Sequence, residues 1–453
     1  MPRHDRLPQS KPPAGRERSA TCSRRALICA ALSSAAAVAA GCGTAGRSSR
    51  VELRYMAWGN PEQLGVEQQL VDGFNRQNRD IHVRLFRVPA SAYLNKAIIM
   101  LASRTAPDVI RIDHYNFPNL VRKEYFRDLS PFADSDAQFD KADIFPAALQ
   151  EGMYRGRLYG LNVLLGGVMM YYNKALFAAA GQPDPYRLWM ERRWTWDRLR
   201  EAAIAISRHA PDGRPERLGV QIPTFPHNAY ILWAFGGEIL SADGKHCLLN
   251  SPGCARAYQF LADLRWKDRV APTPSQGALS AFGFESGKLG MTFDWMGMAP
   301  RFRRAVKSFD WDVCPVPYGP AGGAGILKGN QLVMSAETAY PEKAWRFMRY
   351  LTSARTEAML YGDKLRRGDP ARRSVARSQE FLHASRPPYN TGAYLSALEN
   401  GRLLPIDARW QEWSTVLNAE LDELWGGRDL DAARVLARAA SKVDAVLASE
   451  EGF

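Results

Sequence analysis

Residues 107–113 read Pro-Asp-Val-Ile-Arg-Ile-Asp, a short run that predicts the third strand of a sheet. Residues 51–57 and 81–88 predict the first two strands, and the second of these alternates apolar residues with histidine and arginine. A helical pattern separates the first two strands, and residues 93–103 predict another helix before the third. Strands that alternate with helices favour a parallel sheet with helices on its faces. The predicted fold class is therefore α/β.

The same kinds of segment continue along the chain. Further strands are predicted at 168–172, 218–222, 288–295 and 311–316. Helices are predicted at 174–180, from Thr195 as N-cap to about residue 209, and at 228–235, 254–267, 341–351 and 430–448. The final helix is amphipathic, with its apolar side formed by Val435, Leu436, Ala439, Val443 and Leu447.

The N-terminal region has the features of an export signal. Arg24 and Arg25 precede an apolar run over residues 26–40, and small residues lead to Cys42. A cysteine at this point resembles the lipobox of bacterial lipoproteins, which implies removal of residues 1–41, a lipid on Cys42 and a tether over 42–50. An ordinary signal peptide with a chance cysteine is the alternative. The run is too short for a spanning helix, which needs roughly 20 apolar residues.

The route of export stays open. Ser23-Arg24-Arg25-Ala26-Leu27-Ile28 resembles a twin-arginine motif, but paired arginines are also common in general secretory signals. Which membrane would hold the anchor is open as well.

Composition limits the classes of function. After removal of residues 1–41, 412 of the 453 residues remain, which suits two lobes better than one compact domain. The signal holds seven of 60 basic and two of 47 acidic residues, so 53 and 45 remain, a net charge of +8. These charges are interspersed and no nucleic-acid-binding module is present, so we expect no nucleic-acid partner.

Cys247, Cys254 and Cys314 are the cysteines of the body of the protein. Cys247 and Cys254 flank a turn and could form a disulfide in an oxidising compartment, but sequence cannot supply the geometry. Their spacing does not match a zinc site.

Motifs for reaction chemistry are missing. The sequence contains no H-E-x-x-H and no G-x-S-x-G, and residues 282–289 resemble a phosphate-binding loop only at Gly287 and Lys288. We therefore expect no catalytic residues, no metal and no cofactor. A pair of carboxylates acting on a glycosidic bond stays open, because no pattern selects two of the many present.

Aromatic and polar residues lie at the ends of several predicted strands. Trp58 follows the first strand, His114 and Tyr115 follow the third, and Asp294 and Trp295 end the strand at 288–295. Trp233 lies just before the glycine pair that ends the predicted helix at 228–235. In open α/β sheets, ligands lie outside the carboxyl ends of the strands. Sugars pack their C–H faces on flat aromatic rings and pair their hydroxyls with polar side chains. This set suits a carbohydrate, although each residue alone could equally pack in a core.

Several segments, in order, resemble bacterial extracellular solute-binding proteins of the sugar-importer type, the maltose-binding-like group. They are Ala106-Pro107-Asp108-Val109-Ile110, Gly156-Arg157-Leu158-Tyr159-Gly160-Leu161, Tyr172-Asn173-Lys174-Ala175-Leu176-Phe177, Trp194-Thr195-Trp196-Asp197, Phe282 to Met291, Lys343-Ala344-Trp345-Arg346-Phe347 and Leu351-Thr352-Ser353. Asn162 replaces the proline that usually ends the second segment. The matches span about residues 51–450.

The resemblance implies the two-lobed periplasmic-binding-protein fold, with a hinge and an interlobe ligand cleft. It places the first lobe at 51–161 plus 313–354 and the second at 162–312 plus 355–453. The family positions that contact ligand hold Trp58, Asp113 to Tyr115, Tyr172, and Asp294 with Trp295 here. Asn330 follows Gly329 where members often carry a glycine pair near the cleft.

The leading hypothesis is a monomeric, lipid-anchored receptor outside the cytoplasmic membrane, in the periplasm or at the cell surface. It would deliver a carbohydrate to the permease of an ABC importer without altering it chemically. The alternatives are a binding protein for another polar solute such as a glycerol phosphate ester, a receptor for a signalling partner, and a secreted carbohydrate-active enzyme. Which sugar is bound, and how tightly, does not follow from the sequence.

Overall fold

The computed structural model describes residues 50–277, 282–362, 365 and 368–449. The chain divides into Met1–Arg50 and Val51–Phe453, and the fold below is that of the second unit. The predicted export signal, Cys42 and the tether up to residue 49 lie outside the described residues. Within the described part of the chain, no helix combines the length and apolar character needed to cross a bilayer.

A parallel sheet opens the unit. Strand β1 (Val51–Trp58) pairs in parallel with β2 (Ile81–Val88) on one side and with β3 (Val109–Asp113) on the other. Helices α2 (Pro61–Gln77) and α3 (Ala90–Ala102) make the connections. The three predicted strands and the α/β class are therefore confirmed, with the third strand two residues shorter at its start.

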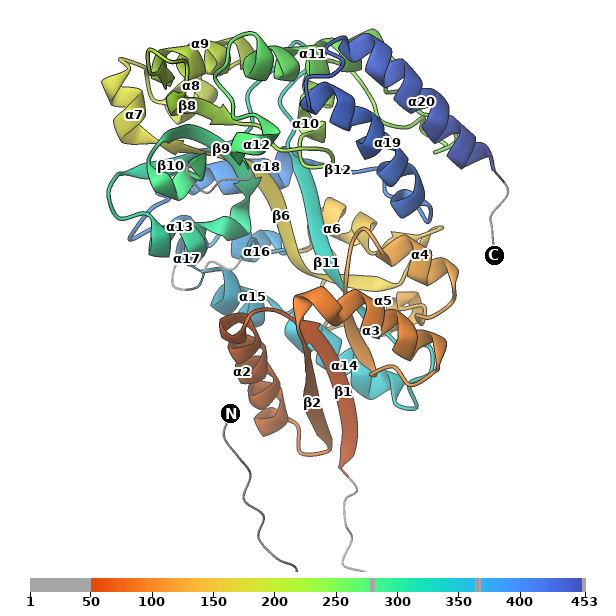
Figure 1. The fold of residues 1–453 in the computed structure, drawn as a ribbon. Coiled ribbons are helices and arrows are strands. Elements are labelled where there is room, and N and C mark those ends of the chain that lie inside the picture. Colours follow the sequence, from red (N-terminus) through yellow and green to blue (C-terminus); the bar gives the residue numbers. More distant parts are fainter. Residues whose placement is uncertain (1–49, 278–281, 363–364, 366–367, 450–453) are drawn as a thin grey trace, which may run out of the picture. The chain divides into compact units, whose positions relative to one another are not determined.

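Two long strands extend this sheet. β6 (Gly160–Asn173) and β11 (Ile326–Met334) are antiparallel neighbours and run side by side through the middle of the unit (Figure 1). The first part of β6 pairs with β11, and its last part, from Val168 to Asn173, pairs with β9 (Leu289–Trp295) and β10 (Trp311–Cys314). β6 therefore belongs to both halves of the sheet.

The other strands complete the order β2-β1-β3-β11-β6-β9-β8-β7. They are β7 (Arg208–His209), β8 (Pro215–Gln221), β12 (Arg402–Leu403), which pairs with β11, and the separate hairpin of β4 (Met153–Tyr154) and β5 (Arg157–Leu158).

Helices cover the sheet throughout the unit. The α-helices not yet named are α4 (Phe117–Arg122), α5 (Ser130–Ser135), α6 (Pro146–Glu151), α7 (Lys174–Ala179), α8 (Pro185–Met190), α9 (Trp196–Ile206), α10 (Ala229–Ala234), α11 (Pro252–Trp266), α12 (Pro274–Gly277), α13 (Ala299–Ala305), α14 (Pro341–Leu351), α15 (Ala354–Tyr361), α16 (Arg373–Ala376), α17 (Gln379–Leu382), α18 (Gly392–Asn400), α19 (Trp410–Trp425) and α20 (Ala432–Ala448). Short 3-10 turns lie at η2 (Phe284–Ser286) and η3 (Met296–Met298).

Local signals explain where several helices begin. Thr195 caps α9 as predicted, because its side chain accepts a hydrogen bond from the backbone N–H of Arg198. Asn60 and Gln63 form a reciprocal capping box at the start of α2. α20 begins at Ala432, two residues later than predicted, after Asp431 as its N-cap.

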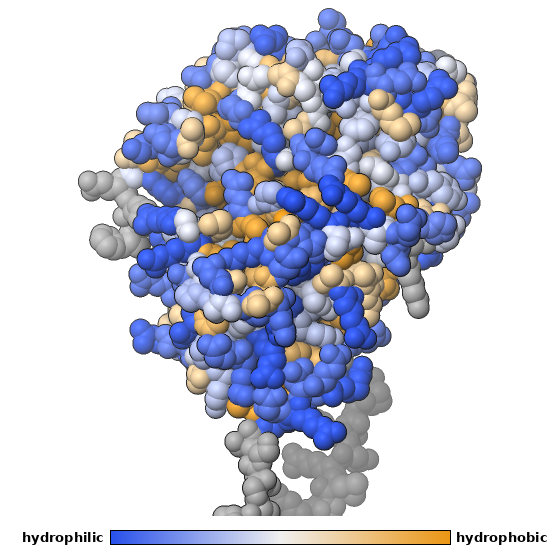
Figure 2. Space-filling view, turned by 180° about the vertical axis from the view of Figure 1, so that it is seen from behind, coloured by the Kyte–Doolittle hydropathy of each residue, from blue (hydrophilic) through white to orange (hydrophobic). Residues whose placement is uncertain are grey.

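Packing between helices closes one end of the unit. α19 and α20 lie against each other (Figure 1), and Trp413 and Leu417 of α19 are fully buried. Four of the five residues predicted for the apolar side of α20, Val435, Leu436, Ala439 and Val443, are buried in the same cluster, and Leu447 packs against it partly exposed. Figure 2 shows hydrophilic residues over most of the opposite face of the unit, with smaller apolar areas between them.

Cys247, Cys254 and Cys314 are all buried free thiols. The disulfide between Cys247 and Cys254 that the sequence left open is therefore not formed in this structure.

Candidate functional site

The register of the central strands brings several predicted site residues together. Asp113, at the end of β3, is the ladder partner of Asn330 on β11. Lys328 pairs with Gly166 of β6, while Val168 of β6 pairs with Trp295 at the end of β9. The ends of β3 and β9 therefore meet at the middle of β6 and β11.

A cavity of about 220 Å³ lies at this meeting point. It is lined by Asp113, His114, Tyr115, Leu164, Gly166, Trp295, Gly297, Lys328, Gly329, Asn330 and Gly368. Five of the nine predicted ligand-binding residues are in this set, namely Asp113, His114, Tyr115, Trp295 and Asn330. We refer to it as the central cavity.

Backbone features shape its wall. The pairing of β6 with β11 shifts register between Asn330 and Gln331, which is the signature of a β-bulge. Such an irregularity changes the direction of nearby side chains. Gly329 has no room for a side chain, because a Cβ there would lie 2.2 Å from the side-chain nitrogen of Asn162. The glycine next to Asn330 is thus required by packing.

Aromatic rings form two walls of the central cavity. Tyr115 stacks on Trp410 of α19, with ring centroids 5.3 Å apart and planes at 20°. His227 meets Trp295 edge-on at 5.0 Å. The ammonium of Lys328 lies 3.7 Å from the ring centroid of Trp295 and 5.4 Å from that of Tyr115. Lys328 therefore occupies the space between the two aromatic walls.

The surroundings of Lys328 are acidic but make no direct bond to it. Within the described residues, its ammonium has neither a hydrogen-bond nor an ion-pair partner. Burial lowers the pKa of Lys328 to about 8, while the nearby carboxylates of Asp113, Glu151 and Asp294 act in the opposite direction. Attraction to the face of Trp295 replaces part of the lost hydration.

Glu151, at the end of α6, holds the strands behind the cavity. Its carboxylate accepts hydrogen bonds from the backbone N–H of Gly329 at 2.7 Å and from the side-chain amides of Gln331 and Asn162. Burial raises the pKa of Glu151 to about 7, against the lowering effect of these donors. This carboxylate ties the segment that carries Lys328 and Asn330 to α6.

Buried polar atoms of the lining are left without partners. The Nε2 of His114 and the hydroxyl of Tyr115 are buried and make no hydrogen bond to the described residues. Burial is the main cause that lowers the pKa of His114 well below its usual range and that of His227 to about 4. Both imidazoles are therefore neutral at pH 7, and each can donate or accept a hydrogen bond.

Four predicted residues lie outside this lining. Trp58 packs on Tyr93 at 4.7 Å and under the guanidinium of Arg111 at 4.4 Å. Trp233 is buried in a hydrophobic cluster. Their ligand-binding role stays a prediction.

The other two predicted residues, Tyr172 and Asp294, form hydrogen bonds within the protein. The buried Tyr172 hydroxyl donates to the Oδ2 of Asp184 at 2.6 Å. Asp294 accepts a hydrogen bond from the backbone N–H of Trp295 at 2.8 Å and lies beside the cavity rather than in its lining.

Three functional candidates escaped the sequence analysis. Lys328, Glu151 and Trp410 lie on β11, α6 and α19, none of which was predicted. The run Trp410-Gln411-Glu412-Trp413 with Leu417 and Leu421 carries the helical spacing that could have revealed α19.

The arrangement is suited to binding. It offers flat aromatic faces, neutral hydrogen-bonding groups and a few charges in a small cavity. Among the described residues, no group of three or more His, Cys, Asp or Glu is placed to hold a metal ion.

These features define a binding protein with an α/β fold and a cavity at the centre of its sheet. The sequence pattern of the bacterial extracellular solute-binding proteins matches residues 59–358, and the chain belongs to this family. Its members are binding proteins rather than enzymes, and they act outside the cytoplasm.

Relatives cover most of the chain. A Brucella abortus protein named as a binding protein is 23% identical, over 84% of this chain and 89% of its own length. The arabinooligosaccharide-binding protein of Bacillus subtilis is 28% identical, over 69% of this chain and 72% of its own.

Solved structures share the fold. An ABC substrate-binding protein of Listeria monocytogenes, in complex with cycloalternan, has a TM-score of 0.77 at 23% identity and covers 88% of this chain and 100% of that one. The sugar-binding protein MalE of Xanthomonas citri has a TM-score of 0.73 at 21% identity and covers 88% and 98%. The predicted two-lobed α/β fold is thereby confirmed.

Proposed function

We propose that this protein is the receptor of an ABC importer and binds a carbohydrate in the central cavity. The observation that carries the proposal is the convergence of Trp295, Tyr115 and Trp410 around a cavity whose lining holds unpartnered polar atoms of His114 and Tyr115. Sugar rings pack on aromatic faces, and their hydroxyls can satisfy buried donors and acceptors. The names of the relatives add support, because several of them bind oligosaccharides.

The charges support a neutral sugar over a phosphate ester. Lys328 and Asp113 are the charged residues in the lining of the central cavity, and Glu151 and Asp294 add two carboxyl groups close to Lys328. A dianionic phosphate would meet these carboxylates at close range, which disfavours it. Hydroxyl groups can instead accept from Lys328 and donate to Asp113.

Binding would act by closing the two lobes. We place the first lobe at 51–161 plus 313–354 and the second at 162–312 plus 355–453, so that one crossing between the lobes falls within β6 and β11 belongs to the first lobe. A ligand that contacts both lobes favours the closed state by its differential affinity, and the permease would recognise that state. The protein would remain at the membrane through a lipid on Cys42 and act as a monomer.

A binding screen tests the central claim. Thermal unfolding would be followed with a panel of mono- and oligosaccharides that includes maltose, maltotetraose and arabino-oligosaccharides. A ligand selective for the native state raises the melting temperature. Calorimetry on the best ligand then compares the wild type with Trp295→Ala, for which we expect a loss of at least tenfold in affinity.

The control is Trp266→Ala, since Trp266 lies on α11 and donates its indole N–H to the backbone oxygen of Leu424, away from the central cavity. Unchanged affinity in Trp295→Ala, or an equal loss in both variants, would refute the stacking role. Chemical conversion of the sugar by the purified protein would refute the receptor itself.

A further inference from the structure

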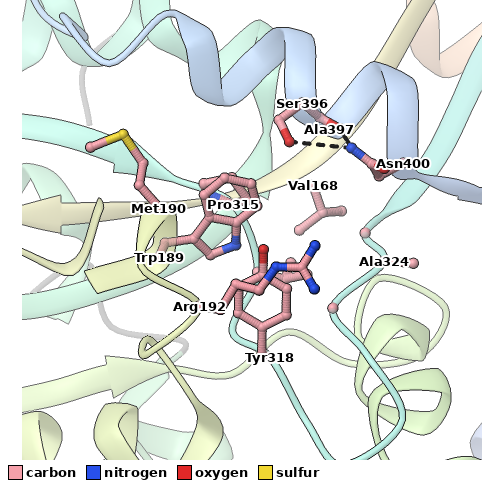
Figure 3. A pocket seen from close by; sticks show the side chains of 13 residues that line it. Val168, Trp189, Met190, Arg192, Pro315, Tyr318, Ala324, Ser396, Ala397 and Asn400 are labelled. Atoms are coloured by element: carbon pink, nitrogen blue, oxygen red, sulfur yellow. Dashed lines mark hydrogen bonds between the residues drawn. The ribbon is translucent and has the colours of Figure 1, made fainter. Parts of the chain in front are cut away.

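A second cavity, of about 470 Å³, shares no lining residue with the central cavity. Figure 3 shows Trp189, Arg192 and Tyr318 on one side of it, and Ser396 and Asn400 of α18 on another. Val168 of β6 lies between them. Cavities that hold small ligands measure on the order of 300–1,000 Å³, so this one is large enough for a molecule of monosaccharide size.

Stacked rings fix one wall of this second cavity. Tyr186 and Trp189 of α8 are parallel within 9° at 6.3 Å, and Trp189 stacks on Tyr318 at 5.5 Å with planes at 17°. Both backbone polar groups of Tyr318 are hydrogen-bonded. Its N–H donates to the carbonyl of Trp194, and its carbonyl accepts from the N–H of Trp196. The wall is therefore preorganised, which lowers the cost of ordering on binding.

The polar groups of this wall are donors. The indole Nε1 of Trp189 is buried and makes no hydrogen bond to the described residues. Within the same part of the chain, neither the guanidinium of Arg192 nor the hydroxyl of Tyr318 has a hydrogen-bond or ion-pair partner. Burial raises the pKa of Tyr318, with Arg192 acting in the opposite direction, so the hydroxyl keeps its proton at neutral pH.

No acidic residue lines this cavity among those described. The side-chain amide of Asn400 donates hydrogen bonds to the backbone and hydroxyl oxygens of Ser396 (Figure 3). The central cavity differs sharply in charge, since carboxyl groups gather around its single lysine. The two cavities should therefore prefer different ligands.

We propose that the second cavity binds a carboxylate-bearing ligand of monosaccharide size, such as a uronate. The carboxylate would accept hydrogen bonds from Arg192, Trp189 and Tyr318, and the sugar body would lie against Val168 and reach Asn400. Hydrogen bonds between charged groups are stronger than neutral ones, and a guanidinium matches the geometry of a carboxylate. This inference stands independently of the proposed function of the central cavity.

The test observes Trp189 directly. The full chain is labelled with 5-fluorotryptophan, the Trp189 and Trp295 signals are assigned with Trp189→Phe and Trp295→Phe, and fluorine NMR follows titration with sodium D-glucuronate. D-glucose at equal ionic strength is the neutral probe. We expect saturable movement of the Trp189 signal by glucuronate, with glucose at least tenfold weaker. No movement, or equal movement by both sugars, overturns the proposal.

A neighbouring arginine provides a matched control. Both arginines are exposed, but Arg193 pairs with Glu191 at 2.8 Å and lies outside the lining, whereas Arg192 lines the cavity. Arg192→Gln should raise the Kd for glucuronate by tenfold or more, and Arg193→Gln should leave it unchanged. Equal effects of the two variants would overturn the site.

Trp295→Ala separates this result from that of the central cavity. The glucuronate titration of Trp189 should persist in that variant, whether or not the central cavity binds sugar. Its loss would show that the Trp189 signal only reports binding at the central cavity, and the second site would then be rejected.

Discussion

At the scale of single residues, Lys328 and Glu151 control the chemistry of the central cavity. Lys328 places a positive charge on the face of Trp295 that a sugar ring would cover. A ligand must therefore displace the ammonium or accept a hydrogen bond from it. Glu151 fixes the backbone next to Lys328 through Gly329. Both side chains are largely buried, and the charge of each shifts the pKa of the other.

Replacing Glu151 by glutamine should change how stability depends on pH. The pKa of Glu151 is about 7 in the folded protein and about 4.3 in an unfolded chain, so the folded state binds more protons between these values. The free energy of unfolding therefore falls as pH rises through this window, by about 3–4 kcal/mol. In the Glu151→Gln variant, the free energy of unfolding should no longer fall over this pH range, as measured by urea unfolding from pH 4 to 8.

The control is Glu342→Gln, an exposed residue in the first turn of α14. Its profile should follow the wild type. Parallel profiles for Glu151→Gln and the wild type would contradict a raised pKa at this position.

A second prediction at this scale concerns membrane attachment through Cys42. Cys42→Ser should move the protein from the membrane fraction to the soluble fraction, because it removes the thiol that would carry the lipid. Fractionation of cells and mass spectrometry of the mature N-terminus measure this. Cys29→Ser, inside the signal, is the control and should leave the anchor in place. Membrane retention of Cys42→Ser would argue against lipid attachment there.

At the scale of elements, α19 links stability to the site. Its buried residues Trp413, Leu417 and Leu421 pack against α20, while Trp410 in its first turn stacks on Tyr115 of the central cavity. The position of an aromatic wall thus depends on the packing of a helix far along the chain. Strand register also positions the site, because the pairing of Asn330 with Asp113 joins β11 and β3, which are far apart in sequence.

Truncating the core of α19 should therefore lower stability. Leu417→Ala removes a fully buried side chain and should lower the free energy of unfolding by about 2–5 kcal/mol. Thr415→Ala, on the exposed side of the same helix, should stay within about 0.5 kcal/mol of the wild type. Denaturant unfolding of both variants measures the difference, and similar values would show that α19 adds little to the core.

At the scale of the whole molecule, the long strands β6 and β11 lie next to each other in the middle of the sheet, where its two halves meet. Hinge closure would then need changes in the backbone dihedral angles of only a few connecting residues. Tyr115, in the proposed first lobe, already stacks on Trp410 in the proposed second lobe. Ligand binding would favour arrangements in which this contact persists.

Closure should be visible in solution. Small-angle X-ray scattering of residues 42–453 should give a smaller radius of gyration with saturating ligand, chosen by the saccharide screen, than without it. The Trp295→Ala variant at the same ligand concentration should keep the larger value. An unchanged radius in the wild type, with binding shown by calorimetry, would indicate a site that fills without lobe movement.

Local sequence patterns determined the α/β class and several of its strands and helices. The runs at 51–57, 81–88 and 107–113 predicted β1, β2 and β3, and Thr195 marked the start of α9, because strand alternation and capping depend on neighbouring residues. The central strand β11, the first part of β6 and helix α19 were among the elements that were not predicted. The two-lobed fold was predicted from the resemblance of the ordered motifs to those of the family.

Tertiary structure alone decided which of the predicted site residues share a cavity. Asp113, His114, Tyr115, Trp295 and Asn330 meet there, whereas Trp58, Tyr172 and Trp233 pack elsewhere. It also brought Lys328, Glu151 and Trp410 to the same place. Strand register and helix packing join residues hundreds of positions apart, and a side chain's burial and partners follow from those distant contacts rather than from its neighbours in sequence.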